Sequence, residues 1–258
     1  MIRSIFRMDV TNVGDWYSTP FRYFDFGPHT SADIKRPVME RGDSVIVGGG
    51  GLVSVNFAPH MERLAARRPI LRRLIAWGIG ESLINDKQGG LVDRWEGPLP
   101  DYLGSFDLVG IRDHGTEYRW VPCASCMLPQ LDREYAVEHE LCIYEHKRIP
   151  VPLDVDVPRR SNDGNDVDAT MRFLGSAETV ITNSYHGAYW ATLLGRRVVA
   201  IPNLSKMYGF RHPPAICAPS DWRRAAQDAV CFPEALEECR SANETFFRQV
   251  SELLGSAA

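Results

Sequence analysis

Residues 178–198 read Glu-Thr-Val-Ile-Thr-Asn-Ser-Tyr-His-Gly-Ala-Tyr-Trp-Ala-Thr-Leu-Leu-Gly-Arg-Arg-Val and place a histidine where a strand meets a helix. The run from Val180 to Thr182 predicts a buried strand, and apolar residues at helical spacing predict a helix from Tyr185 to Leu194. His186 then lies in the first helical turn, at the carboxyl edge of a parallel sheet. Open α/β folds bind ligands at that edge, and free backbone N–H groups there favour an anion. We therefore expect a phosphate-bearing substrate.

Short apolar runs and helical segments alternate along the chain. Predicted strands cover residues 2–8, 44–47, 74–77, 108–111, 140–144, 180–182 and 197–201. Predicted helices cover residues 61–68, 166–174, 185–194, 221–230 and 233–254, and the polar segments 159–165 and 203–219 are predicted loops. This alternation favours parallel βαβ units. The irregular, proline-containing segment 115–133 suits a connection between domains, so we predict two Rossmann-like domains, residues 1–133 and 134–258, that face each other across a cleft.

Composition excludes several classes of protein. The 258 residues are 44% hydrophobic and 24% charged, which is typical of a soluble globular protein. A net charge of −4 without a basic block disfavours nucleic-acid binding. We expect a cytoplasmic protein without a transmembrane segment, because no signal peptide and no run of about 18 apolar residues is present. Cys123 and Cys126 have ligand spacing but lack a second pair, so we expect no metal site.

Loops of the first half carry residues suited to recognition. In Asn12-Val-Gly-Asp15 the carboxylate follows a strand and can accept a proton from a sugar hydroxyl, or Asn12 and Asp15 can simply cap a turn and a helix. The run Gly48 to Gly51 allows close approach of a ligand or of another backbone. Arg112-Asp113 is either an anion clamp or an internal ion pair. The candidate binding residues here are Asn12, Gly14, Gly49, Gly50 and Arg112.

Loops of the second half add imidazole and cationic groups. Because the carboxyl ends of parallel strands meet at one edge of a sheet, His146, Lys206 and Arg211 are expected to face the same crevice as His186. A histidine beside a phosphate can act as a general acid or base. The further candidate binding residues are Asn183, Ser184, Tyr185 and Gly187, and Asn183 or Ser184 is also the expected N-cap of the helix.

These motifs, in this order, resemble those of the polysaccharide pyruvyl transferases. The matching stretches are Asn12-Val-Gly-Asp15, the strand into Gly48-Gly-Gly-Gly51, the strand into Gly78-Ile-Gly80, Val109-Gly-Ile-Arg-Asp113 and Thr182-Asn-Ser-Tyr-His-Gly187. They cover most of the chain, and the last is the most specific. The resemblance implies a GT-B-like fold of two Rossmann-like domains.

The resemblance also implies a reaction. A pyruvyl group passes from phosphoenolpyruvate to two hydroxyls of a sugar in a glycan or lipid-linked precursor, and the product is a cyclic ketal. The acid that protonates the methylene carbon would be His186, and Asp15 would be the base. This chemistry requires no metal and no organic cofactor. The acceptor sugar is left open, and so is the oligomeric state, with a homo-oligomer compatible with the sequence.

The chain departs from the resemblance at one point. Many members have Arg-Leu-His-Gly, whereas this chain has Ser184 and Tyr185 before His186. We expect Lys206 or Arg211 to replace the missing guanidinium.

Two alternative functions share the predicted fold. The first is a GT-B glycosyltransferase with a nucleotide-sugar donor, for which Asp166 and Asp168 are available as ribose ligands. The second is a sugar- or phosphate-binding subunit without catalysis.

Overall fold

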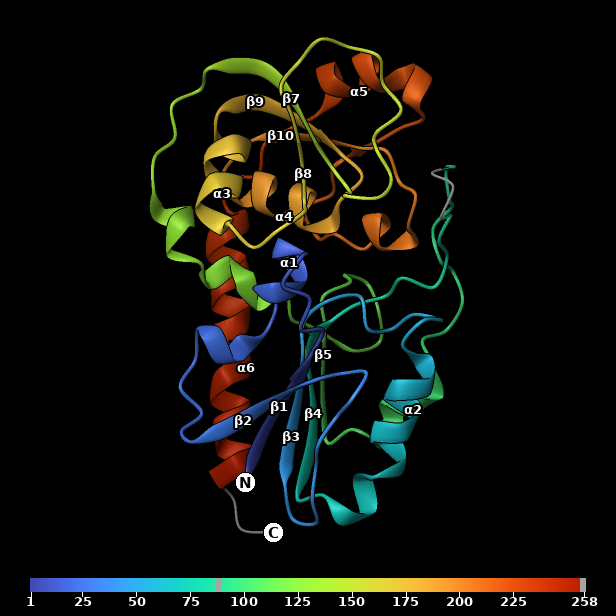
Figure 1. The fold of residues 1–258 in the computed structure, drawn as a ribbon, viewed down its shortest axis with the longest axis vertical. Coiled ribbons are helices and arrows are strands. Elements are labelled where there is room, and N and C mark those ends of the chain that lie inside the picture. The colour runs from blue at the N-terminus through green and yellow to red at the C-terminus, as the bar shows by residue number, and fades with distance from the viewer. Residues whose placement is uncertain (87–89, 256–258) are drawn as a thin grey trace.

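The computed structural model describes residues 1–86 and 90–255 and contains two β-sheets, one above the other in Figure 1. The strand order is β2-β1-β3-β4-β5-β6 in the first sheet and β11-β10-β9-β7-β8 in the second. Every strand pair in both sheets is parallel. The prediction of a mixed α/β chain with two parallel sheets is therefore confirmed.

The elements have the following bounds. The first sheet comprises β1 (Ile2–Phe6), β2 (His29–Asp33), β3 (Ser44–Gly48), β4 (Arg73–Ile79), β5 (Leu108–Ile111) and β6 (Arg119–Trp120). The second comprises β7 (His139–Glu145), β8 (Arg159–Ser161), β9 (Ala177–Thr182), β10 (Arg197–Ala200) and β11 (Ala215–Ile216). The α-helices are α1 (Val13–Trp16), α2 (Ala58–Ala66), α3 (Val167–Gly175), α4 (Tyr185–Leu193), α5 (Trp222–Asp228) and α6 (Ala235–Gly255).

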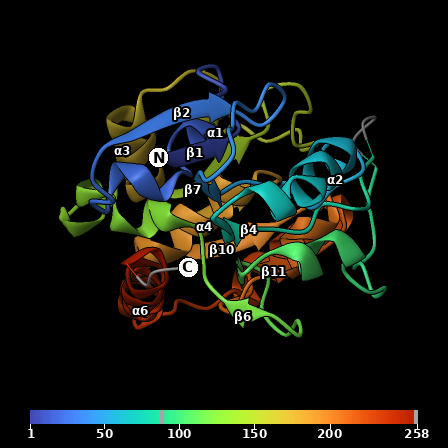
Figure 2. The same ribbon diagram turned by 90° about the horizontal axis from the view of Figure 1, so that it is seen from below.

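The central strands β3 and β4 of the first sheet are buried on both faces, which explains why they read as continuous apolar runs. On β3, Val45 and Val47 face the core that includes α2, whereas Ile46 faces the core that includes Phe246 of α6. Figure 2 shows α2 and α6 on opposite sides of this sheet. The last helix of the chain thus returns to the first sheet, and the division into domains at residue 133 stays a prediction.

The second sheet is also covered on both faces. Cys142 and Tyr144 of β7 pack into the core formed with α3 and α4, and Ile143 packs into the core formed with α5. All nine residues of α4 are buried. Figure 1 shows α4 beside the second sheet, with α1 below it, between the two sheets.

Edge strands were not predicted from the sequence. Residues 159–161 were predicted as part of a loop, but they form β8 and pair with β7, with Arg159 opposite Ile143. The exposed strand β2 was missed in the same way, and β11 lies within the predicted loop 203–219. An edge strand is held by backbone hydrogen bonds on one side only, so its side chains need not be apolar.

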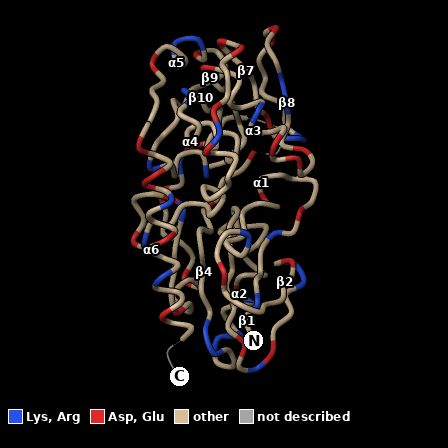
Figure 3. The backbone as a smooth tube through the Cα atoms, turned by 90° about the vertical axis from the view of Figure 1, so that its left-hand side faces the viewer, with Lys and Arg blue, Asp and Glu red and all other residues tan. Residues whose placement is uncertain are grey.

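Charged side chains are mixed over the surface. Figure 3 shows Lys and Arg interspersed with Asp and Glu along both halves of the chain. Within the described residues, no helix combines the length and the apolar character that crossing a membrane requires.

Helix α6 is fastened to the first sheet by a buried amide. Asn243 is fully buried, and its Oδ1 accepts a hydrogen bond from Trp77 Nε1 of β4 at 2.8 Å. Its Nδ2 donates to the carbonyl oxygens of Pro122 at 3.2 Å and Cys239 at 3.0 Å. One side chain therefore joins the helix, the central strand and the segment that links the two sheets.

We expect Asn243→Ala to lower the free energy of unfolding by about 2–3 kcal/mol, because it leaves the buried Trp77 N–H unpaired and opens a small cavity. Equilibrium unfolding in urea measures this loss. Glu244→Ala is the matched control, since Glu244 is the exposed next residue of the same helix. Equal stability of the two variants would show that the amide does not fasten α6.

Candidate active site

The start of α4 is built as the sequence predicts. Ser184 is the N-cap, and its Oγ accepts a hydrogen bond from Gly187 N at 3.4 Å. Asn183 instead holds the loop after β7, because its Oδ1 accepts from His146 N at 2.7 Å. A Cβ on Gly187 would lie 2.4 Å from Cδ1 of Tyr144, so this glycine permits close packing of α4 on β7. His186 lies in the first turn of the helix.

The imidazole of His186 is enclosed by both halves of the chain, with 6% of the residue exposed. Its ring packs on Trp190 with 5.0 Å between centroids, and its Nε2 lies 3.4 Å from Cys123 Sγ. On the other side is Gly14 of α1, where a Cβ would lie 2.1 Å from Nδ1. Only glycine fits at residue 14 with the ring in this position.

Burial favours the neutral forms of both His186 and Cys123. Burial lowers the pKa of His186 well below its ordinary value, and the positive charges of Arg112 and Lys206 lower it further. Burial also raises the pKa of the Cys123 thiol. Because reactive thiolates need a lowered thiol pKa, this pair does not have the electrostatics of a cysteine nucleophile. His186 must gain a proton before it can act as an acid.

Arg112, at the carboxyl end of β5, carries the most unusual contact of the site. It is 2% exposed, and its guanidinium carbon lies 3.6 Å from the centroid of the Tyr185 ring. Within the described residues, its Nε and Nη2 have no hydrogen-bond partner and it forms no ion pair with Asp113. A Cβ on Gly80 would lie 2.1 Å from Nε, so the glycine makes room for the guanidinium. Of the two interpretations of Arg112-Asp113, this arrangement favours the anion clamp.

Lys206, in a 3-10 turn after β10, belongs to the same group of charges. Burial and the charge of Arg112 lower its pKa to about 8, while the charge of Asp15 acts in the opposite direction. Burial, followed by the charge of Lys206, lowers the pKa of His146 to about 4. Charged groups from loops at the carboxyl ends of strands in both sheets therefore act on one another here.

The Asn12 to Asp15 motif both caps a helix and borders the site. Asn12 is the N-cap of α1: its Oδ1 accepts from Gly14 N at 3.2 Å, and its Nδ2 donates to Asp15 Oδ2 at 3.0 Å. Burial raises the pKa of Asp15. Gly49 and Gly50 have φ of 67° and 80°, and a Cβ on Gly50 would lie 3.7 Å from Asp15 Oδ1. The capping interpretation of Asn12 is confirmed, and the glycine loop packs against the same motif.

Arg211 is engaged elsewhere. Its Nε donates to Glu238 Oε2 of α6 at 2.8 Å, and its guanidinium carbon lies 4.9 Å from the ring centroid of Trp120. Because its charge is already paired, Lys206 is the better of the two expected replacements for the missing arginine.

Three buried polar residues near the site were not among the predicted site residues. Glu81 follows β4 and accepts a hydrogen bond from Ser205 Oγ, and Asp113 follows Arg112. Asn203 follows β10, and neither polar atom of its side chain has a partner among the described residues. All three stand at carboxyl ends of parallel strands, the signal that identified His186.

Within residues 1–86 and 90–255, no group of three His, Cys, Asp or Glu side chains is arranged to hold a metal ion.

Comparison with known proteins agrees with this geometry. A solved structure, described as that of a functional uncharacterized protein from Klebsiella pneumoniae subsp. pneumoniae NTUH-K2044, aligns with a TM-score of 0.50 and 16% identity, over 78% of this chain and 83% of that chain. At that identity the likeness shows the fold alone. No curated protein matches the chain. The family model described as polysaccharide pyruvyl transferase matches residues 3–205, which include every motif named above. The chain therefore belongs to the polysaccharide pyruvyl transferase family and is a transferase.

Proposed function

We propose that the chain transfers a pyruvyl group from phosphoenolpyruvate to two hydroxyls of a sugar in a glycan precursor, forming a cyclic ketal. The observation that carries this proposal is the buried guanidinium of Arg112, two of whose nitrogens have no hydrogen-bond partner among the described residues and whose charge acts on Lys206. Phosphoenolpyruvate carries a phosphate and a carboxylate, and the planar fork of an arginine suits either group. A buried cation without a partner is costly, so an anionic donor is the ligand that this site favours.

Arg112 belongs to a stretch that matches the family, so it does not itself replace the arginine missing at Ser184 and Tyr185. The Tyr185 ring instead supports the Arg112 guanidinium, which comes from the end of β5. A cation over an aromatic ring is stabilised by the negative face of the ring. The positive charge is thus kept near His186, although it comes from the other sheet.

The reaction needs two hydroxyl protons to be moved. Two O–H bonds of the sugar, the π bond between C2 and C3 of the donor and the C2–O bond to its phosphate break, while two C–O bonds form at C2 and one C–H bond forms at C3; one proton goes to that methylene carbon and the other leaves with the phosphate. We propose His186 as the acid and Asp15 as a base. A donor anion beside Arg112 and Lys206 offsets their charges and so raises the pKa of His186. Since Gly14 and Cys123 cover the ring nitrogens, the ring must separate from one of them to deliver its proton.

The nucleotide-sugar alternative has less support. Asp166 caps α3 by accepting from Ala169 N at 2.9 Å, and Asp168 pairs with Arg133 at 2.6 Å. Both proposed ribose ligands are therefore used within the fold. We keep the GT-B-like arrangement and the cytoplasmic location as predictions.

Calorimetric titration with phosphoenolpyruvate, beside UDP-glucose and GDP-mannose, tests the donor. We expect selective binding of phosphoenolpyruvate, and Arg112→Gln should weaken it by roughly 10- to 100-fold, the value of lost charge-assisted hydrogen bonds. Arg211→Gln is the control and should bind normally, because Arg211 is paired with Glu238. Preference for a nucleotide sugar would replace this proposal with the glycosyltransferase.

The pH dependence of kcat/KM for phosphoenolpyruvate tests Lys206. Lysine is cationic below its pKa, so kcat/KM should fall as the pH rises above about 8. In Lys206→Arg the fall should move to higher pH, because arginine stays protonated. If kcat/KM of Lys206→Arg falls over the same pH range as in the wild type, the titration of Lys206 is not the cause of the fall.

Proton uptake tests His186. When donor binding is measured calorimetrically in buffers of different ionisation enthalpy, the wild type should take up more protons than His186→Gln. Turnover of the variant should drop by roughly 10²- to 10⁴-fold, the usual contribution of general acid catalysis. His29→Gln, at an exposed histidine of β2, is the control. Near-normal turnover of His186→Gln would remove the acid role.

A further inference from the structure

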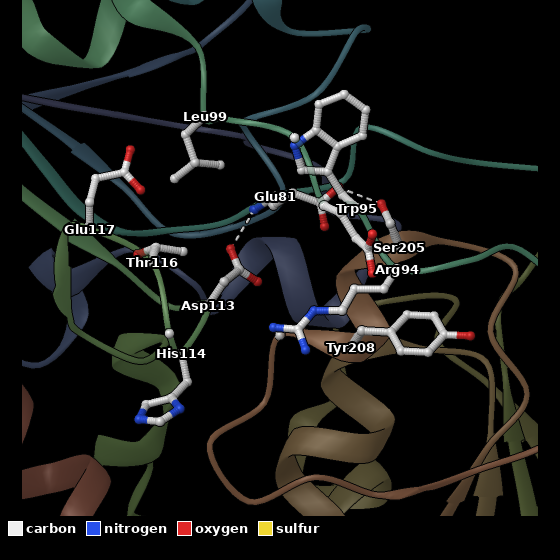
Figure 4. A pocket seen from close by; sticks show the side chains of 14 residues that line it. Glu81, Arg94, Trp95, Leu99, Asp113, His114, Thr116, Glu117, Ser205 and Tyr208 are labelled. Atoms are coloured by element: carbon white, nitrogen blue, oxygen red, sulfur yellow. Dashed lines mark hydrogen bonds between the residues drawn. The ribbon is translucent and has the colours of Figure 1, made fainter.

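A pocket of about 340 Å³ borders the group of charges around Arg112 (Figure 4). Its walls come from residues 94–99, from residues 113–117 after β5, and from residues 205–209 of the turn after β10. Asp113 is the neighbour of Arg112 in sequence, and Ser205 is the neighbour of Lys206. A molecule in this pocket would therefore lie next to a donor held by Arg112 and Lys206.

Two buried polar atoms of the lining residues have no partner in the described parts of the chain, Asp113 Oδ1 and Thr116 Oγ1. Asp113 is 5% exposed, and its Oδ2 is fixed by a hydrogen bond from Glu81 N at 2.6 Å. Its Oδ1 points toward Gly209, another lining residue, where a Cβ would lie 2.3 Å away. Buried polar atoms are nearly always hydrogen-bonded, so these two indicate a ligand with hydroxyl groups.

The charge of the pocket excludes the donor. Its walls include four carboxyl groups, those of Glu81, Glu96, Asp113 and Glu117, against one guanidinium, that of Arg94. Such a lining repels phosphoenolpyruvate. Trp95 and Tyr208 add aromatic surface, and Figure 4 shows them across the pocket from Thr116. Carboxylates and hydroxyls beside aromatic rings can bind the hydroxyls and the apolar face of a sugar ring.

We propose that this pocket is the acceptor subsite, that it takes an uncharged hexopyranose, and that Asp113 Oδ1 and Thr116 Oγ1 bind its hydroxyls. The proposal rests on the proposed function, because it needs a sugar to be the second substrate. An anionic sugar, such as a uronic acid or a sugar phosphate, is disfavoured by the four carboxyl groups.

The charged groups that act on Asp113 come from three elements: Arg112 after β5, Glu81 after β4, and Lys206 after β10. Burial raises the pKa of Asp113 to about 7, and the charge of Arg112 opposes this rise. Above that pH the carboxylate accepts a hydrogen bond from a sugar hydroxyl. Acceptor binding should therefore strengthen as the pH rises through about 7.

Saturation-transfer NMR with methyl glycosides tests the subsite. The probes are the methyl pyranosides of glucose, galactose, mannose, N-acetylglucosamine and N-acetylmannosamine, with methyl glucuronide as the anionic counterpart, each in the presence of phosphoenolpyruvate. We expect at least one neutral probe to bind, and methyl glucuronide to bind at least tenfold more weakly than methyl glucoside. Thr116→Val should weaken the neutral probe about fivefold, and Asp113→Asn about tenfold or more.

Both substitutions keep the shape of the side chain, and Thr116 Oγ1 has no described partner to lose. We therefore expect both variants to fold. Measured by calorimetry, Thr116→Val should bind phosphoenolpyruvate within about twofold of the wild type, and Asp113→Asn should bind it at least as tightly, because a negative charge that acts on Arg112 and Lys206 is removed. If phosphoenolpyruvate binds but no neutral probe does, or if both variants bind the probe normally, the acceptor subsite is wrong while the donor site stands. If phosphoenolpyruvate itself does not bind, the result contradicts the proposed function, and the acceptor subsite that rests on it is rejected as well.

Discussion

The contact between Arg112 and Tyr185 is the constraint on which the site depends. It joins the carboxyl end of β5 to the first turn of α4, and so joins the two sheets. The guanidinium is held by an aromatic face and by the space above Gly80, while two of its nitrogens have no hydrogen-bond partner among the described residues. Burying a cation in this way costs stability, which the proposed anionic donor would offset.

Two further contacts hold the elements around the site together. Gly14 lies against the His186 ring, and Asn243 fastens α6 to Trp77 and to the segment that links the sheets. The imidazole is buried at this point, with 6% of the residue exposed. The low dielectric that keeps His186 neutral also strengthens its response to any charge that arrives. Burial therefore lowers the pKa of His186 and also makes that pKa sensitive to a bound anion.

The site is divided by charge. Arg112 and Lys206 make one part positive, and the four carboxyl groups of the neighbouring pocket make the other negative. Because Arg112 and Asp113 are consecutive residues at the end of a strand, the two parts meet at a single peptide bond. This division suits the proposed reaction between an anionic donor and a neutral acceptor, because the carboxyl groups repel the donor from the pocket while an uncharged sugar is not repelled.

The sequence predicts the two parallel sheets, a helix from Tyr185 with Asn183 or Ser184 as its N-cap, and the place of His186 in the first turn. Apolar periodicity and capping chemistry are local, so they can be read from neighbouring residues. The sequence does not predict the edge strand β8, whose pairing depends on β7, or the contact of Cys123 with His186 and the burial of Asp113. The tertiary structure alone shows that Lys206 interacts electrostatically with Arg112 and Asp15, whereas Arg211 pairs with Glu238. The choice depends on distances between residues far apart in the chain, and the packing of the two sheets sets those distances.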